Sequence, residues 1–250
     1  MSRLGRLGPL TPVAVALTLA VSFLGSCTDH EPEDAVEAVG SETITIRTAD
    51  GLTLDGRVWD RGHDRLVIYL HEFRENQDSW WPYAREPRGE GISALTFDFR
   101  GHGKSEGNLD DIDGMVLDAE AAIAFARDRG FERVMLVGAG MGAAVGLVAA
   151  ADVPDVTIVG FSTPADFDTL DTVDVVERLD GRVQLIATRD DVSAADSLHK
   201  FRALGNVDST EARLYPGGGH GVDLLSEHAT HSISERFDEL LADFWVPHTP

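Results

Sequence analysis

The stretch Gly138-Ala139-Gly140-Met141-Gly142 joins a predicted strand to a predicted helix. The apolar run 134–137 precedes it, and residues 141–150, which carry apolar side chains at helical spacing, follow it. Dinucleotide-binding turns also join a strand to a helix, but they have the spacing Gly-x-Gly-x-x-Gly, whereas this stretch reads Gly-x-Gly-x-Gly. The sequence therefore indicates a tight strand-to-helix turn and no nucleotide site of that kind.

The alternation of strands and helices continues on both sides of this turn. Two runs, 43–48 and 52–59, are separated by Ala49-Asp50-Gly51 and predict a hairpin. Later strands are apolar at consecutive positions, as expected where helices cover both faces of a parallel sheet. The sequence therefore predicts an α/β fold with a doubly wound, mostly parallel sheet. Its further strands are expected at 66–70, 92–99, 156–161 and 183–187, and its further helices at 115–129, 194–204 and 233–245.

Four motifs, in this order and spacing, resemble the α/β-hydrolase family. They are His71-Glu72-Phe73, the stretch 98–105 (DFRGHGKS), the turn 138–142, and Gly217-Gly218-Gly219-His220-Gly221. The resemblance covers residues 43–245 and implies an α/β-hydrolase fold with a short lid at 163–180. It also implies acyl-transfer chemistry, in which a hydroxyl or thiol attacks a carbonyl, a histidine takes its proton and a carboxylate orients the histidine.

The resemblance implies positions for the nucleophile, the general base and the orienting carboxylate, but the nucleophile position has no reactive side chain. The family's turn has the form G-x-S-x-G with the nucleophile at its centre, and here that position holds Gly140, which has no side chain to react. His220 matches the general base. The orienting carboxylate is expected just after the strand 183–187, at Asp190 or Asp191, with Asp191 favoured by its spacing from Thr188.

Backbone N–H groups would form the oxyanion hole of such a site. The resemblance places one at Met141 and the other in the loop Glu72-Phe73. Glu72 departs from the family, which commonly has glycine after the histidine, and its acidic side chain would oppose negative charge developing nearby. The stretch 98–105 is expected to be structural, so neither His102 nor Ser105 is assigned to catalysis.

Three explanations of Gly140 stay open at this point, and with them the question of whether the protein is an enzyme. In the first, the chain is a non-catalytic pseudohydrolase with a binding or envelope role and a small-molecule ligand in its vestigial pocket. In the second, water activated by His220 gives weak or atypical ester hydrolysis. In the third, the nucleophile has moved to Ser162 or Thr163. The lid contains aspartates at 166, 168, 171 and 174, which predict a negative pocket mouth that disfavours anionic ligands.

The amino terminus has the pattern of an export signal. Arg3 and Arg6 precede the apolar stretch 10–24, which is short for a transmembrane helix. The stretch ends in Leu24-Gly25-Ser26-Cys27, which resembles the lipobox of bacterial lipoproteins, in which the cysteine is lipidated and becomes the first residue. The alternative is an ordinary signal peptide with a chance cysteine. The lipobox predicts an extracytoplasmic protein anchored to the membrane through Cys27.

These patterns divide the chain into a lipoprotein signal peptide (1–26), an acidic tether (27–41) and an α/β-hydrolase domain (42–250). The formal charge of −22 becomes −24 once the two arginines of the signal are removed, which argues against nucleic-acid binding. No HExxH pattern or P-loop occurs, so no metal site and no cofactor are expected. The ligand and the oligomeric state are not predicted.

Overall fold

The computed structural model describes residues 40–62, 64–86, 91–179, 182–203, 211–226 and 231–245. The expected signal peptide (1–26), Cys27 and nearly all of the tether (27–41) lie outside these residues. The α/β domain expected from residue 42 lies mostly within them.

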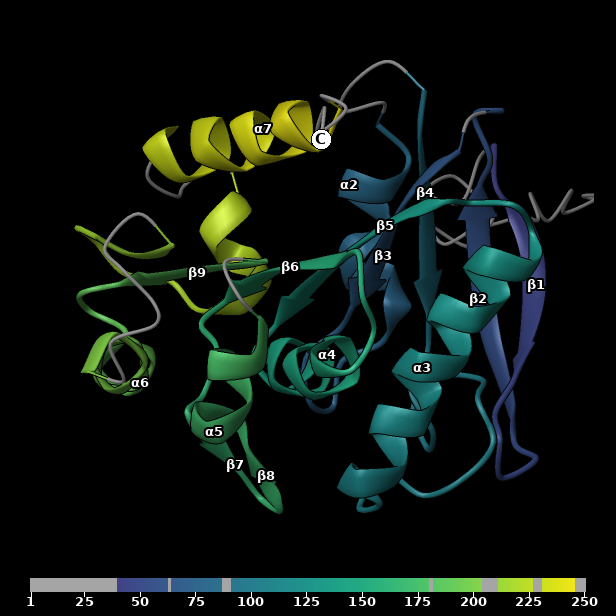
Figure 1. Cartoon of the computed structure of the whole chain (residues 1–250), viewed down its shortest axis with the longest axis horizontal. Helices are drawn as coiled ribbons and strands as arrows, with labels where there is room; N and C mark the ends of the chain where they lie inside the picture. Colours follow the sequence, from purple (N-terminus) through teal and green to yellow (C-terminus); the bar gives the residue numbers. More distant parts are fainter. Residues whose placement is uncertain are drawn as a thin grey trace, which may run out of the picture. The chain divides into compact units, whose positions relative to one another are not determined.

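An eight-stranded sheet forms the centre of this domain, in the order β1-β2-β4-β3-β5-β6-β9-β10 (Figure 1). The first hairpin and its neighbour pair antiparallel, β1 with β2 and β2 with β4, and all other pairs are parallel. This arrangement confirms the predicted mostly parallel sheet. The strands are β1 (Glu42–Arg47), β2 (Thr53–Trp59), β3 (Arg65–Leu70), β4 (Ile92–Phe97), β5 (Arg133–Ala139), β6 (Val156–Phe161), β9 (Val183–Thr188) and β10 (Ala212–Tyr215).

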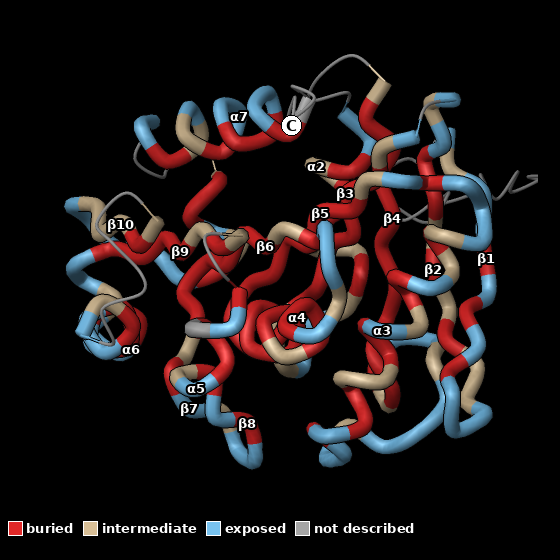
Figure 2. The backbone as a smooth tube through the Cα atoms, in the orientation of Figure 1, coloured by how far each residue is buried: buried red, intermediate tan, exposed pale blue. Residues whose placement is uncertain are grey.

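Helices cover both faces of the sheet and give the domain two hydrophobic cores. On one face lie α2 (Trp81–Ala84) and α7 (His231–Trp245), and on the other lie α3 (Ile112–Asp128), α4 (Met141–Ala151) and α6 (Val192–Ala203) (Figure 1). Figure 2 shows that α4 is buried over almost its whole surface, whereas α7 has one buried face and one exposed face. Helix α4 therefore sits at the centre of the fold, and its first residue, Met141, directly follows the turn after β5.

Short elements complete the chain. The expected lid region contains the hairpin of β7 (Asp166–Phe167) and β8 (Leu170–Asp171), followed by α5 (Thr172–Val176) and the 3-10 helix η2 (Glu177–Leu179). Two more 3-10 helices are η1 (Gln77–Trp80) and η3 (Gly221–Leu225). The lid region is therefore small.

The predicted element boundaries differ from the structure where a side chain caps a helix or bonds outside the sheet. Helix α3 begins three residues early because the Asp111 carboxylate accepts the Gly114 N–H. Strand β4 ends at Phe97. The Asp98 N–H still donates to Asp55 O beside β2, in the β2–β4 register, but the Phe99 N–H turns away from the sheet and donates to His71 Nε2.

Candidate functional site

The turn between β5 and α4, residues 138–142, is called the elbow below. Its central residue, Gly140, has φ of 50° and ψ of −118°, in the left-handed region that favours glycine. The flanking glycines allow a close approach of helix and sheet: a Cβ on Gly142 would overlap the Leu70 carbonyl, and one on Gly138 would lie 2.6 Å from Ala143 N. The glycines recognised in the sequence therefore let α4 start directly against β3 and β5.

Gly140 nevertheless has space for a side chain. A Cβ built there would lie 3.5 Å from Glu72 Oε2 and 3.5 Å from His220 Nε2, both ordinary van der Waals contacts. A side chain at this position would point at the imidazole. The elbow thus lacks a reacting atom and retains the room for one.

His220 is oriented by one of the two candidate acids. Its Nδ1 lies 2.7 Å from Asp191 Oδ2, and the Asp191 side chain is only 10% exposed. Asp191 also caps α6, because its Oδ1 accepts the Ala194 N–H at 3.3 Å. Within the described residues Asp190 makes no hydrogen bond or ion pair with His220, and its N–H donates to Gly217 O. The geometry therefore favours Asp191.

Glu72 lies on the opposite side of the imidazole. Its Oε2 is 3.5 Å from His220 Nε2, and its Oε1 accepts the Val222 N–H at 2.9 Å. Gly221 makes this placement possible, since it has φ of 54° and a Cβ on it would overlap Glu72 Oε1. His220 therefore lies between two carboxylates, those of Asp191 and Glu72.

Two of the backbone N–H groups expected at the oxyanion hole, those of Met141 and of Phe73 in the loop Glu72-Phe73, have no hydrogen-bond acceptor among the described residues. Met141 is the first residue of α4, so the helix dipole adds positive potential at its N–H. Glu72 lines the same pocket. An oxyanion bound at these donors would therefore have a carboxylate for a neighbour.

His71 anchors the loop that carries Glu72. The ring is fully buried, its Nδ1 lies 2.8 Å from Glu72 O, and its Nε2 lies 3.0 Å from Phe99 N. Because the Phe99 N–H can only donate, Nε2 is the acceptor and Nδ1–H donates to the carbonyl. Burial lowers the pKa of His71 to about 3, and nearby His102 lowers it as well, against the opposing effect of the Glu72 carbonyl. His71 is therefore a neutral structural group.

Ser162 and Thr163, the two candidates for a relocated nucleophile, are buried at the end of β6. Ser162 has φ of 49°, and its Oγ accepts the Gly221 N–H at 3.0 Å. Thr163 Oγ1 points back toward Gly160, where an added Cβ would overlap it. Neither hydroxyl is bonded to His220 within the described residues. Ser162 instead holds the loop that carries His220.

A pocket of about 230 Å3 opens at the elbow and is called the elbow pocket below. The four lid aspartates expected at its mouth are exposed and do not line it, and one of them, Asp166, pairs with Lys200 at 2.9 Å. Among the described lining residues the one carboxylate is that of Glu72. The lining consists of Glu72, Phe73, Gly140, Met141, Ser162, Pro164, Phe167, Ser193, Ala194 and His220.

Four of these lining residues were not identified from the sequence: Pro164, Phe167, Ser193 and Ala194. Pro164 follows β6, Phe167 comes from the β7–β8 hairpin and the other two come from the start of α6. No motif marks them. The available signal was general, because residues that follow the carboxyl ends of parallel strands gather at one edge of the sheet.

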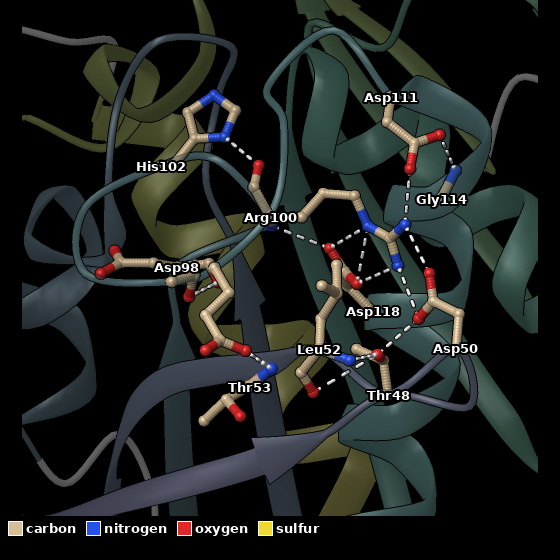
Figure 3. Close-up of polar contacts among 12 residues, drawn as sticks. Thr48, Asp50, Leu52, Thr53, Asp98, Arg100, His102, Asp111, Gly114 and Asp118 are labelled. Carbon is tan, nitrogen blue, oxygen red and sulfur yellow. Dashed lines mark hydrogen bonds and ion pairs between the residues drawn. The ribbon is translucent and has the colours of Figure 1, made fainter.

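The motif 98–105 supports the fold through polar contacts around Arg100 (Figure 3). Arg100 is 1% exposed, and its guanidinium nitrogens lie 2.7 Å from Asp118, 2.6 Å from Asp111 and 2.9 Å from Asp50. Burial alone would lower the pKa of Arg100, but hydrogen bonds to these three carboxylates raise it. His102 bonds the Arg100 carbonyl. The motif therefore ties the β1–β2 turn to α3, the structural role that the sequence indicated.

The described part of the chain contains no group of three or more histidine, cysteine, aspartate or glutamate side chains placed to hold a metal ion. No helix in it has the length and apolarity needed to cross a membrane.

The elbow lies within a segment that matches a known protein family. Residues 61–167 match the family described as serine aminopeptidase, S33. An uncharacterised protein, YfhR, from Salmonella typhi is 31% identical over 111 residues, and its counterpart in Salmonella typhimurium is equally similar. These matches cover 41% of this chain and 38% of each relative, so the chain spans well under half the length of the curated relatives it matches.

Solved structures resemble nearly the whole described domain. The alpha/beta hydrolase GrgF from Penicillium sp. sh18 has a TM-score of 0.67 at 16% identity and covers 82% of this chain and 97% of its own. XC6422 from Xanthomonas campestris, a serine hydrolase without lid, has a TM-score of 0.64 at 21% identity, and the match covers 85% of this chain and 98% of XC6422. Esterase Pf2001 from Pyrococcus furiosus has a TM-score of 0.60 at 18% identity, and the match covers 84% of this chain and 91% of Pf2001. At these identities the similarity shows the fold.

Proposed function

This chain has the α/β-hydrolase fold, and from that premise we propose that it is a pseudohydrolase, which binds a small molecule in the elbow pocket without forming an acyl-enzyme. Gly140 carries the proposal. It stands where the family resemblance places the nucleophile, in a backbone conformation suited to a strained elbow, and it has no atom that could attack a carbonyl.

Glu72 supports the same proposal. Acyl transfer develops negative charge at the oxyanion donors, and preorganised positive dipoles are what stabilise it. Here the carboxylate of Glu72 lines the pocket beside Met141 and Phe73, which carry N–H groups at the positions expected for the oxyanion hole. The site therefore lacks the nucleophile and also carries a group that opposes the transition state. Both the absence of a nucleophile and the presence of the Glu72 carboxylate are compatible with a binding role.

A weak hydrolase is the second candidate function. The side-chain position at Gly140 faces His220 Nε2. In this reaction the imidazole, held by Asp191 at Nδ1, would deprotonate a water molecule in that space. Loss of one triad member in a serine protease leaves roughly 10³–10⁴-fold catalysis over water, which sets the scale for such residual activity. The Glu72 carboxylate would lower it further.

Restoring the nucleophile tests the proposal directly. Wild type is expected to show no fluorophosphonate labelling and no turnover of short acyl esters that depends on His220. The variant Gly140→Ser places a hydroxyl toward His220 Nε2, because the Cβ at this position meets only ordinary contacts. In a Glu72→Gly background it should hydrolyse such esters at least about 10²-fold faster than the matched variant Gly140→Ala, which adds Cβ without the hydroxyl.

The outcomes separate the two candidate functions. Wild-type turnover that disappears in His220→Ala would refute the pseudohydrolase and support the weak hydrolase. Failure of Gly140→Ser to gain activity in either background, with its fold intact by circular dichroism, would show that the remaining groups are not arranged as a hydrolase site. In that case the relation of the elbow pocket to a former active site would be wrong.

We place this protein on the extracytoplasmic face of the cell membrane, anchored through lipidated Cys27. The proposal rests on the export pattern of residues 1–26 and the lipobox-like stretch that ends at Cys27. Two or more acyl chains hold a protein firmly at a membrane. In membrane fractionation the wild type should sediment with membranes and Cys27→Ser should not. Equal membrane association of the two would contradict the anchor, and the ordinary signal peptide would then be preferred.

A further inference from the structure

The elbow pocket combines apolar walls with one carboxylate. Phe73, Phe167 and Met141 contribute apolar surface, and the rings of Phe73 and Phe167 are 6.0 Å apart between centroids. Glu72 and His220 are the ionisable groups among the described lining residues, and no lysine or arginine lines the pocket there. An entering ligand therefore meets a mostly apolar surface with a single anionic group.

Among the described residues, no lysine or arginine pairs with the Glu72 carboxylate, which is held by a backbone N–H. Its side chain is 20% exposed, and its Oε1 is taken up by the Val222 N–H at 2.9 Å. Its Oε2 has His220 Nε2 at 3.5 Å, which is longer than a good hydrogen bond, and His220 already bonds Asp191 at 2.7 Å. Burial of a carboxylate is unfavourable unless it is paired. Oε2 is therefore an acceptor that a ligand cation can satisfy.

From this arrangement we propose that the elbow pocket binds an organic cation, with an ammonium group at Glu72 Oε2 and an apolar group against Phe73 and Phe167. The inference rests on the proposed binding function and names its ligand class. A charge-assisted hydrogen bond to a carboxylate is the strongest contact available among the described lining groups. The elbow pocket has a volume of about 230 Å3, and its apolar walls suit a small aryl or alkyl group.

The same arrangement disfavours anions. A carboxylate or phosphate in the pocket would lie against Glu72, with Asp191 directly behind His220. The net charge of the chain, −22, adds a repulsive background. Specificity here would thus come from rejection of anions as well as attraction of cations.

Three probes of similar size and different charge test the proposal: phenethylammonium, phenethyl alcohol and hydrocinnamate. Isothermal titration calorimetry of the full chain in nonionic detergent should give the tightest binding to the ammonium probe and the weakest to hydrocinnamate. Glu72→Gln should weaken ammonium binding about tenfold or more and leave the alcohol unaffected. The matched control is Glu75→Gln, an equal change of charge at an exposed residue of the same loop, which should alter the affinity less than about twofold.

Equal affinities for the ammonium and alcohol probes would overturn the proposal, as would an equal effect of the two glutamine substitutions. Failure of the ammonium probe to bind at millimolar concentration would also overturn it. Should Glu72→Gln fail to fold, the comparison of the three probes on wild type still decides. Wild-type turnover lost in His220→Ala would refute the pseudohydrolase, while the order of the three affinities would still report on the charge preference.

Discussion

His71 makes the stability of the fold depend on pH within a defined window. In the folded state its pKa is lowered to about 3, chiefly by burial, whereas the value in an unfolded chain is about 6.5. Below about pH 6.5 the unfolded chain therefore takes up a proton that the folded chain refuses. Stability is fully present above that pH and is lost as the pH falls toward about 3.

The size of the effect follows from this difference. One pH unit corresponds to about 1.4 kcal/mol when one state binds one more proton than the other. Going from about pH 7.5 to about pH 5 crosses roughly 1.5 units below the unfolded pKa, so the free energy of unfolding should fall by about 2 kcal/mol through His71 alone. Other groups titrate too, so a variant must isolate this contribution.

The assay is urea denaturation of the full chain at both pH values, followed by circular dichroism. His71→Gln keeps a donor and an acceptor but cannot titrate, so its loss of stability between the two pH values should be about 2 kcal/mol smaller than that of wild type. The control is His231→Gln, because this side chain is 88% exposed. An equal pH dependence in wild type and His71→Gln would refute the reasoning, even if the variant is less stable at both values.

Two further predictions concern the parts of the fold that hold the site. Arg100→Met leaves Asp118 buried without its cation and should lower the free energy of unfolding by about 3–5 kcal/mol, against less than about 1 kcal/mol for Arg129→Met in an exposed ion pair. Similar losses in urea denaturation would contradict this account of the buried network. Gly142→Ala forces a Cβ into the Leu70 carbonyl and should cost about 3 kcal/mol, whereas Gly218→Ala, with its nearest contact at 3.6 Å, should cost less than about 0.5 kcal/mol. A thermal unfolding midpoint unchanged by Gly142→Ala would show that the elbow tolerates more space than its geometry implies.

The central strands could be predicted from sequence because the burial of both faces leaves a simple pattern. Strand β6 was predicted with its observed bounds, Val156–Phe161, since apolar residues dominate it and charged residues precede it. The segment Gln77–Ala84 was not predicted as helical. It is one turn of 3-10 helix and one of α-helix, too short to establish a helical repeat in the sequence.

The site could be predicted as a set of positions but not as a set of contacts. Adjacent aspartates at 190 and 191 follow the same strand, and only the start of α6 determines which one turns toward His220. Glu72 was recognised as a departure from the family pattern. The direction of its side chain depends on Val222, which is 150 residues away in the sequence, and no local pattern encodes such a contact.

The missing Cβ of Gly221 has a consequence for how this site changes over evolution. Because any larger residue at 221 would occupy the space of the Glu72 carboxylate, the two positions are not free to vary independently. A larger residue at 221 would push the Glu72 carboxylate, the far end of a flexible side chain, away from Val222 and His220, so a glutamate at 72 keeps these contacts only beside a glycine at 221. Among related sequences that place a carboxylate from position 72 beside the histidine, position 221 should therefore be glycine.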